Sequence, residues 1–496
     1  MNFSSIDYIV IVVYLIGVAV FGIYISGRQK SVSDYFLGSR NIPWWAACFS
    51  VVATETSTLT FLSIPGVAYL TNMGFLQLAI GFLIGRIVVA FLFIPKYYAG
   101  NLETAYQFLG NRFGYAMRRY SSVTFILLRI FADGVRLFTT AIPIKLLTGM
   151  SYFETILIVG AITVVYAYIG GIKAVIWTDV IQMFVYFLGA IITIIVIWNL
   201  LPNGFADVTA FASQGDKFNV FNFTMPSSFG EFFTGNYNAI GGIIGGAFLA
   251  MASHGTDQII VQRLLTCKDK TASQKALIGS GILVFLQFAM FLLIGVMLFA
   301  FYKGVEYTAL SVDGHMLTKT DEIFPKFIIE SLPVGIAGLV IAGLLAASMS
   351  TLSSTFNSLA STTILDLFKF KDKGISPEKE LKYSRLATLF WAVVVVGTAM
   401  LFLDEKNPAV AYALNIQSII YGGLLGVFLL GMAWKSARLG DSIVAYSIAI
   451  LVLILLFILP KFNVFPAVNF TWFTITGVIV VFITAGISIS IRKAFK

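Results

Sequence analysis

Long apolar segments separated by short polar loops run through the whole chain. A helix needs roughly 20 mostly apolar residues to cross a bilayer, and thirteen segments come near or exceed this length. They are Ile6–Ile25, Trp44–Tyr69, Phe75–Phe93, Ser121–Leu147, Phe153–Ile169, Ala174–Leu200, Tyr237–Gln262, Ala276–Phe301, Val334–Leu367, Leu386–Leu403, Ala409–Trp434, Ser442–Leu459 and Phe470–Ile489. The pattern predicts an all-α integral membrane protein with about 13 transmembrane helices.

The loops between these segments differ in charge. With the N-terminus outside, 23 of the 33 Lys and Arg residues fall in cytoplasmic loops or the C-terminal tail, six fall in outside loops and four lie within helices. Arg263 is among the 23, and the four are Arg86, Arg129, Arg136 and Lys145. Because cytoplasmic loops are enriched in Lys and Arg, this split predicts an outside N-terminus, an inside C-terminus and an odd number of helices.

The composition excludes several classes of protein. Hydrophobic residues make up 58% and charged residues 11% of the 496 positions, and the mean hydropathy is +0.90, whereas soluble domains carry about 25% charged residues. With two Cys and two His residues, neither a disulfide scaffold nor a His/Cys metal site is expected. The net charge of +9 is assigned to loops that face anionic lipid, so we expect a lipid bilayer as partner and no nucleic acid.

The second apolar segment is unusually polar in its middle. Residues 53–60 read Ala-Thr-Glu-Thr-Ser-Thr-Leu-Thr, and the helix breakers Pro65 and Gly66 follow. Polar side chains inside a membrane are costly and are functional candidates by default. A break in this helix would free carbonyls for a cation and aim half-helix ends at a substrate. The alternative is that the hydroxyls bond back to their own helix and pack between helices.

A second hydroxyl-rich segment lies within residues 334–367. Its polar residues are spaced three or four positions apart and therefore share one helix face; they are Ser350, Ser354, Asn357, Ser358 and Ser361. A face of oxygen donors suits a small hard cation. The alternative is a seam of small residues that lets two helices pack closely.

Two ionisable residues within apolar segments are further candidates. Asp179 either ligates a cation or pairs with Lys173 near the cytoplasmic surface. Arg136 offers a planar fork of donors that suits a substrate carboxylate, but Asp133 lies one helical turn earlier and could form an internal ion pair.

Three other polar residues in the apolar segments are given structural roles. Arg86 is assigned to helix packing or an inner gate, and Arg129 to structure. His254 is interpreted as a buried hydrogen-bonding residue rather than as a ligand.

Four motifs resemble the sodium:solute symporter family, in order and spacing, between about residues 30 and 440. They are Asp34–Arg40 with Trp44–Trp45, Gly170–Val175 with Thr178, Asp179 and Gln182, Gly255–Gln258 with Gln262 and Arg263, and Ala347–Asp366 with Asn357 and Ser358. Within the family, residues 53–60 and Arg136 are most similar to bacterial sodium-coupled sialic acid transporters.

The resemblance implies a single transporter domain, 1–496, around a LeuT-like core of two inverted five-helix repeats whose first helices are broken. The implied parts are an extra N-terminal helix and loop (1–40), the first repeat (41–201), the second repeat (236–434) and two C-terminal helices (435–496).

The resemblance also implies site residues. A sodium ion would bind between the segments Trp44–Tyr69 and Val334–Leu367. Its ligands would be the carbonyls of Ala53, Thr56 and Ala347 and the hydroxyls of Ser350 and Thr351. A second sodium ion would bind Asp179, Ser350, Ser353 and Ser354. The substrate position corresponds to Glu55, Ser57, Thr58, Thr60, Phe75, Gln77 and Arg136, with Ser57, Thr60 and Arg136 on a carboxylate and Gln77 and Glu55 on hydroxyl or amide groups.

These features together predict a symporter and not an enzyme. We expect a multi-pass protein of a bacterial-type inner membrane that moves an anionic sugar, sialic acid, with two sodium ions by alternating access, as a monomer. Proline, a neutral sugar or a monocarboxylate are the alternative substrates. An intramembrane enzyme would need a nucleophile and a base at one depth, for which His254 with Asp257 is the only hint, and a sensor would usually carry a soluble signalling domain.

Overall fold

The structure is a computed structural model of the chain that describes residues 4–224, 226, 228–235, 238–312, 315–368, 374–401 and 409–495. Some residues used in the sequence predictions lie outside these ranges; they are Tyr237, Lys369, Lys371, Lys373, Leu403, Lys406 and Lys496.

The described chain is almost entirely helical. Its α-helices are α1 (Ser5–Ser26), α2 (Val32–Leu37), α3 (Trp44–Glu55), α4 (Thr58–Leu70), α5 (Leu76–Leu92), α6 (Ile94–Ala99), α7 (Ala105–Phe113), α8 (Tyr115–Thr148), α9 (Tyr152–Leu200), α10 (Phe205–Gln214), α11 (Phe229–Thr234), α12 (Ala239–Gly255), α13 (Gln258–Leu265), α14 (Lys270–Phe301), α15 (Ile323–Ser331), α16 (Ile336–Ser361), α17 (Pro377–Ala399), α18 (Ala409–Ala433), α19 (Leu439–Ile458) and α20 (Phe473–Ala494). The π-helix η5 (Thr362–Phe368) continues α16, and β1 (Ser311–Val312) pairs with β2 (His315–Met316) in an antiparallel ribbon.

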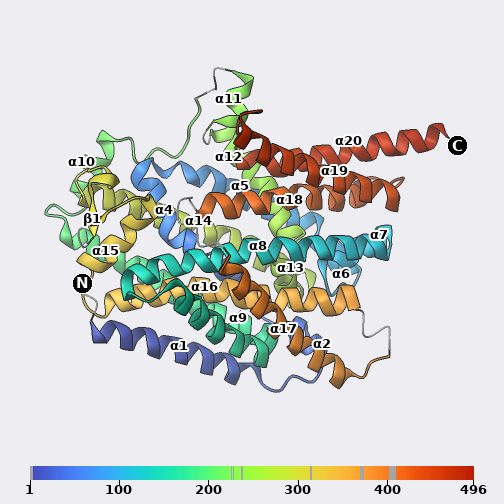
Figure 1. Ribbon diagram of the computed structural model, residues 1–496, viewed down its shortest axis with the longest axis horizontal. Coiled ribbons are helices and arrows are strands. Elements are labelled where there is room, and N and C mark those ends of the chain that lie inside the picture. The colour runs from blue at the N-terminus through green and yellow to red at the C-terminus, as the bar shows by residue number, and fades with distance from the viewer. Residues whose placement is uncertain are drawn as a thin grey trace.

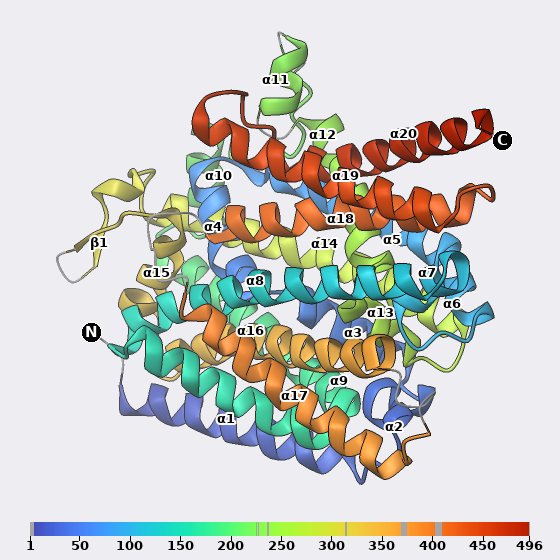
Figure 2. The ribbon, with the colours of Figure 1, turned by 45° about the vertical axis from the view of Figure 1, so that its right-hand side comes forward.

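The long helices lie roughly side by side and form a bundle (Figures 1 and 2). α8 lies in the middle of the bundle, where it packs against both α16 and α18. The N-terminal end of the described chain, together with α15 and β1, lies at one end of the bundle, and the C-terminal end of α20 lies at the other. The two termini are therefore on opposite sides along the helix direction.

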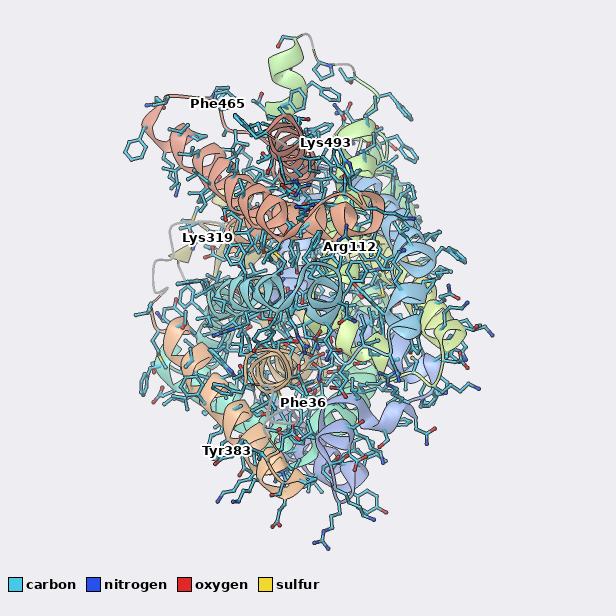
Figure 3. The ribbon with its side chains drawn as sticks, turned by 90° about the vertical axis from the view of Figure 1, so that its right-hand side faces the viewer. Phe36, Arg112, Lys319, Tyr383, Phe465 and Lys493 are labelled. Carbon is cyan, nitrogen blue, oxygen red and sulfur yellow. The ribbon has the colours of Figure 1, made fainter. Side chains whose placement is uncertain are left out.

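Large apolar side chains cover the outside of the bundle. Phe91 and Val393 are each 66% exposed, and Ile483 is 58% exposed. Viewed along the helices, Tyr383 and Phe465 project from the rim (Figure 3). Contiguous apolar surface of this kind marks contact with a membrane rather than with water.

The predicted apolar segments coincide with the long helices. Each segment lies on one helix or on one broken pair, and the two segments between residues 153 and 200 are the two halves of α9. Among the described residues, seven helices are long and apolar enough to cross a membrane, or up to nine if each of two bent pairs counts as one span.

Two of these helices are broken at their centres. α3 and α4 are bent by 62° across Thr56 and Ser57, and α12 and α13 are bent by 61° across Thr256 and Asp257. At the first break the Ser57 amide donates to the Thr60 hydroxyl (3.4 Å), so a side chain takes the place of a helix carbonyl. Both predicted breaks are present in the structure.

The expected helix breakers are not the place where the first helix breaks. Pro65 and Gly66 lie inside α4, on the C-terminal side of the break. Gly66 instead permits a close approach, since a Cβ there would lie 2.6 Å from the carbonyl oxygen of Thr320. The hydroxyl-rich turn, and not the proline, makes the break.

The break within α9 depends on a glycine. Gly171 has φ 57° and ψ −153°, a backbone conformation that residues with a side chain rarely adopt. A Cβ on Gly171 would also lie 2.4 Å from the carbonyl oxygen of Tyr35. The Gly170–Gly171 motif thus lets α2 pack against the turn between the two halves of α9.

One cation that the charge count placed in a cytoplasmic loop is inside the protein. Arg263 lies within α13, is fully buried and pairs with Asp179. The prediction was wrong because α13 continues to Leu265, past the predicted end of this apolar segment at Gln262, so Arg263 is still inside the bundle.

The two long loops contain short elements of secondary structure. Residues 202–236 include α10 and α11, and residues 302–327 include the β-ribbon and the start of α15. Lys217 in the first loop donates to the carbonyl oxygen of Tyr69 (2.7 Å), which caps the end of α4. The loops therefore hold α4, the C-terminal half of the first broken helix, in place.

We expect Gly85→Ala to destabilise the protein, because α5 and α12 are in backbone contact there. A Cβ at Gly85 would lie 2.3 Å from the carbonyl oxygen of Ala247, and overpacking of this kind costs about 1–3 kcal/mol. Thermal unfolding in detergent should show a lower midpoint. Gly17→Ala is the matched control, since nothing lies within 4 Å of a Cβ at Gly17 in α1; equal midpoints for the two variants would contradict this packing.

Candidate functional site

A cavity lies where the two broken helices meet α8, α14, α16 and α18. The cavity has a volume of about 150 Å³, which is room for a small organic molecule rather than a single ion. Its walls are formed by Thr54, Glu55, Ser57, Thr60, Ile64, Phe75, Leu78, Phe82, Arg129, Arg136, Leu249, Ser253, His254, Ile259, Ile260, Phe288, Thr351, Gln417 and Tyr421.

The end of α3 is bound to α16 beside this cavity. The Thr351 hydroxyl donates to the carbonyl oxygen of Thr54 (3.2 Å), and the hydroxyls of Thr54 and Ser354 are 3.2 Å apart. The last four carbonyls of a helix have no partner within it, and here a hydroxyl of α16 bonds to one of them, the Thr54 carbonyl. This is an oxygen-rich environment suited to a hard cation.

Thr351, predicted for the first sodium site, makes this contact, and two other predicted residues, Ala53 and Ala347, lie next to it. Ala53 is at the end of α3, and Thr351 also donates to the carbonyl oxygen of Ala347 (3.2 Å). The Thr56 hydroxyl donates to the Gln287 side chain (2.9 Å) and lies 3.1 Å from the Tyr186 hydroxyl, so it is engaged outside this contact. Ser350 lies on α16, next to Thr351, and is fully buried.

The residues predicted for the second sodium site also lie close together, and Arg263 is an additional member of the group. Asp179 accepts hydrogen bonds from the hydroxyls of Ser350 (2.7 Å) and Ser50 (2.5 Å). Arg263 pairs with the same carboxylate (2.9 Å) and also donates to Ser354. The alternative pairing of Asp179 with a cytoplasmic lysine is wrong, because Asp179 is fully buried against this arginine.

Two serines of the second predicted site, Ser353 and Ser354, bond to the carbonyl oxygen of Ser350. Ser353 donates to the carbonyl oxygen of Ser350 (3.1 Å), and Ser354 donates to it as well (2.5 Å). The Oδ1 atom of Asp179 accepts from Ser350, while Oδ2 accepts from Ser50 and Arg263. Oδ1 therefore keeps more of its acceptor capacity than Oδ2.

One side of the cavity is suited to an anion. Arg136 donates to Asp133 (3.1 Å) and to the side chain of Gln417 (2.8 Å), and its side chain is 19% exposed toward the cavity. Ser57 and Thr60 lie in the first turn of α4, whose N-terminus carries a partial positive charge. The internal pair of Asp133 and Arg136 is thus present, and Arg136 lines the cavity at the same time.

The opposite side of the cavity carries a second charged cluster. Glu55 pairs with Arg86, which is fully buried, and His254 lies 3.6 Å from the same carboxylate. The Nε atom of Arg86 donates to Nε2 of His254 (3.1 Å). Arg86 therefore neutralises Glu55, so the negative charge of Glu55 does not repel an anionic substrate.

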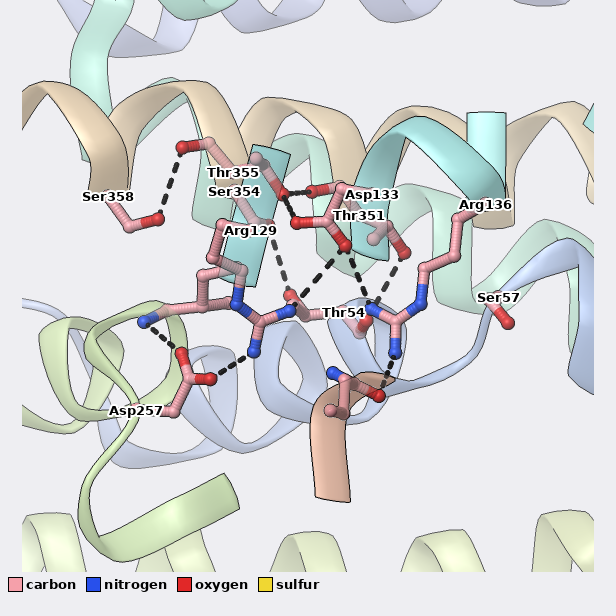
Figure 4. Close-up of polar contacts among 12 residues, drawn as sticks. Thr54, Ser57, Arg129, Asp133, Arg136, Asp257, Thr351, Ser354, Thr355 and Ser358 are labelled. Atoms are coloured by element: carbon pink, nitrogen blue, oxygen red, sulfur yellow. Dashed lines mark hydrogen bonds and ion pairs between the residues drawn. The ribbon is translucent and has the colours of Figure 1, made fainter. Parts of the chain in front are cut away.

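Arg129 joins the inner part of the cavity to the second broken helix. Its guanidinium pairs with Asp257 and donates to the Tyr421 hydroxyl (2.6 Å). Tyr421 in turn donates to Asp257 (2.5 Å). A residue assigned only to structure from the sequence therefore lines the cavity and contacts the break between α12 and α13 (Figure 4).

Two predicted substrate residues do not line the cavity. The Thr58 hydroxyl is 2.9 Å from the hydroxyl of Thr140 on α8. The Gln77 amide donates to the carbonyl oxygen of Gly74 (2.9 Å) and accepts from the backbone of Asn222 (3.1 Å). Phe75 does line the cavity, and its ring lies 4.9 Å from that of Phe288.

Sequence reasoning identified the charged residues of the site but missed their partners. It identified Glu55, Arg136 and Asp179, but it did not connect Glu55 to Arg86 or Asp179 to Arg263. The available signal was the rarity of charge within apolar segments, since each buried acid requires a cation nearby.

The chain matches a known family over most of its length. The sodium:solute symporter family matches residues 35–445. The sodium/sialic acid symporter NanT of Aliivibrio fischeri is 31% identical over 448 residues, which cover 89% of this chain and 86% of that protein. The sodium/sialic acid symporter SiaT of Proteus mirabilis is 30% identical over 455 residues, which cover 91% of this chain and 89% of that protein.

A solved structure is similar over the whole chain. It is a Na⁺-coupled sialic acid symporter in a substrate-bound, outward-open state, described as revealing a novel Na⁺ site. The TM-score is 0.86 at 28% sequence identity, and the alignment covers 99% of this chain and 98% of that chain. The helical bundle and its broken helices therefore belong to a known transporter fold.

We expect Glu55→Gln to destabilise the protein by about 3 kcal/mol, because it leaves the buried Arg86 guanidinium without its anion. Replacing both partners, in Glu55→Gln with Arg86→Met, should recover most of the loss. Chemical unfolding in detergent measures both. Lys268→Gln serves as control, since the Lys268 side chain is 75% exposed and such pairs contribute little. A double variant as unstable as the single one would refute the pairing.

Proposed function

The chain belongs to the sodium:solute symporter family, and we propose that it is a secondary active transporter that couples sodium entry to the symport of a carboxylated sugar, with sialic acid (N-acetylneuraminate) as substrate. The observation that carries the proposal is the junction of the broken helix with α16. There, the hydroxyl of Thr351 donates to the carbonyl oxygen of Thr54, beside a cavity that Arg136 lines.

The two ends of the broken helix suit ions of opposite charge. The end of α3 carries partial negative charge on its last carbonyl oxygens, and the start of α4 carries partial positive charge. A sodium ion bound by Ala53, Thr56, Ala347, Ser350 and Thr351 would fix the break from one side. A carboxylate bound by Ser57, Thr60 and Arg136 would fix it from the other.

A second sodium ion is part of the proposal. Asp179, Ser350, Ser353 and Ser354 would hold it, with Oδ1 of Asp179 as the acceptor that has the most remaining capacity. Arg263 stays on the other carboxylate oxygen. Since Ser350 belongs to both sodium sites, the two ions would be coupled through one hydroxyl.

The rest of the substrate would face the other wall of the cavity. Phe75 and Phe288 offer apolar surface to a sugar ring. The neutralised pair of Glu55 and Arg86, with His254, offers acceptors and donors for hydroxyl or amide groups. A carboxylate at one end and hydroxyls at the other match the chemistry of a sialic acid.

The membrane arrangement follows from the same proposal. The chain would cross the inner membrane 13 times as a monomer, with its N-terminus outside and its C-terminus in the cytoplasm, consistent with termini at opposite ends of the bundle (Figure 1). The inverted repeats would span residues 41–201 and 236–434, flanked by an N-terminal helix and loop (1–40) and two C-terminal helices (435–496).

Transport then follows from alternating access. Sodium binding at the end of α3 pre-organises Ser57 and Thr60 for the substrate, and the loaded bundle rocks to open inward. Each sodium ion that moves inward gains about 2.3 kcal/mol per 100 mV of membrane potential. Two sodium ions with one monoanion carry a net positive charge, so the membrane potential also drives uptake.

Purified protein in liposomes should take up labelled N-acetylneuraminate only when a sodium gradient points inward, and an inside-negative potential should increase the uptake. A potassium gradient of the same size is the control. Equal uptake in potassium would refute sodium coupling, whereas sodium-driven uptake of proline, glucose or pyruvate in preference to N-acetylneuraminate would refute only the substrate.

Ser350→Ala should raise the sodium concentration needed for half-maximal uptake by at least about tenfold, which corresponds to 1.4 kcal/mol of lost binding. Ser358→Ala is the matched control, because Ser358 is a buried serine of the same helix whose hydroxyl donates to the carbonyl oxygen of Thr355 within that helix (3.1 Å). Sodium titrations of initial uptake rates compare the two. An unchanged sodium requirement in the first variant would remove Ser350 from the sodium sites.

A further inference from the structure

Four charged residues of alternating sign form a buried row from the cavity to the second broken helix (Figure 4). Arg136 pairs with Asp133 (3.1 Å), Asp133 lies 3.5 Å from Arg129, and Arg129 pairs with Asp257. Three of the four residues are on α8, at positions three and four apart, so they share one face of that helix.

The end of the row at Arg136 is its most accessible part. The Arg136 side chain is 19% exposed, whereas Arg129 is 4% exposed and both acids are fully buried. An anion in the cavity can therefore reach Arg136 but not the acids behind it. The Oδ2 atom of Asp133 is held by the Thr355 hydroxyl (2.6 Å), so this carboxylate stays near both arginines.

The other end of the row lies in a hinge. Asp257 is the N-cap of α13, and its Oδ1 atom accepts from the Ile259 amide (2.9 Å). Its Oδ2 atom accepts from Arg129 and from Tyr421. One carboxylate thus fixes the first turn of α13 and ties the 61° break to α8 and α18.

Arg129 binds its two acids through different nitrogen atoms. Nη1 is the atom nearest Asp133, and Nη2 is the atom that contacts Asp257. A closer approach of Asp133 would therefore orient the guanidinium without withdrawing it from Asp257. Both acids can therefore contact Arg129 at the same time.

We propose that Asp133 transmits the occupancy of Arg136 to the break between α12 and α13, so that a carboxylate in the cavity tightens the tie between α8 and Asp257. A ligand carboxylate shares Arg136, and Asp133 then balances its charge on Arg129. With the ligand bound, three carboxylates share the two guanidiniums, and the hydroxyls of Thr355 and Tyr421 also donate to Asp133 and Asp257, so no carboxylate is left without a donor.

The coupling is reciprocal. If ligand binding stabilises the tie at Asp257, loss of that tie must weaken ligand binding by the same factor. The inference rests on the proposed function for the carboxylated ligand. Its test uses no ligand, so that failure of N-acetylneuraminate uptake and failure of this coupling are separate results.

The test is amide hydrogen exchange of the full chain in lipid nanodiscs, read at residues 256–262 around the Ile259 amide. Arg136→Gln releases Asp133 to Arg129 and so mimics ligand occupancy. It should slow exchange at the break by at least about fivefold, the lower end of typical coupling between sites. Adding Asp133→Asn to this variant should abolish the slowing.

Two controls separate coupling from a general change in stability. Arg136→Lys keeps a cation beside Asp133 and should exchange like the parent protein. Arg119→Gln removes an exposed arginine of the same helix and should also have no effect. Exchange that is unchanged or faster in Arg136→Gln would overturn the proposal.

A single variant covers the case in which Arg136→Gln does not fold. Asp133→Asn alone removes the shared anion, so Arg129 loses one of its two acids. Exchange at residues 256–262 should become faster than in the parent protein, while exchange in α20, far from the row, stays the same. Unchanged exchange at the break would overturn the proposal equally.

Discussion

The structure depends on the contact between a helix end and a neighbouring helix in the interior of the bundle. A membrane offers no water to unpaired carbonyl oxygens, so a broken helix survives there only where other groups satisfy its ends. α16 does this with hydroxyls, of which Thr351 donates to the carbonyl oxygen of Thr54. In the proposed sodium site, the oxygens that stabilise the break would also bind the ion.

Charge pairing is the second constraint. Glu55 with Arg86, Asp179 with Arg263, and Asp257 with Arg129 all bring together residues far apart in the sequence and on different helices. An unpaired ion at this depth would cost several kcal/mol. Each pair therefore fixes the relative position of two helices, and each lies within or next to a break or a predicted ion site.

The cavity is arranged by these constraints. Carbonyl oxygens lie at one end of the broken turn and the positive end of α4 at the other, so cation and carboxylate can be held within one short segment. Arg136 extends this arrangement, because it faces the cavity while it remains bound to Asp133. A ligand at Arg136 thus meets a group already connected to the second break, and the two broken helices are not independent.

The sequence alone determined the apolar segments, the break in the first polar helix and the residue types of the candidate sites, because hydrophobic length and misplaced hydroxyls are local properties. The second break was implied by the family resemblance. The sequence could not place the first break, which lies at Thr56 and Ser57 rather than at Pro65, nor show that Arg263 returns to the interior. It also could not assign Gln77, whose amide is bound by a loop. Only the tertiary structure decided these points, since the partner of a buried charge or amide is chosen by packing between distant helices and not by neighbours in the chain.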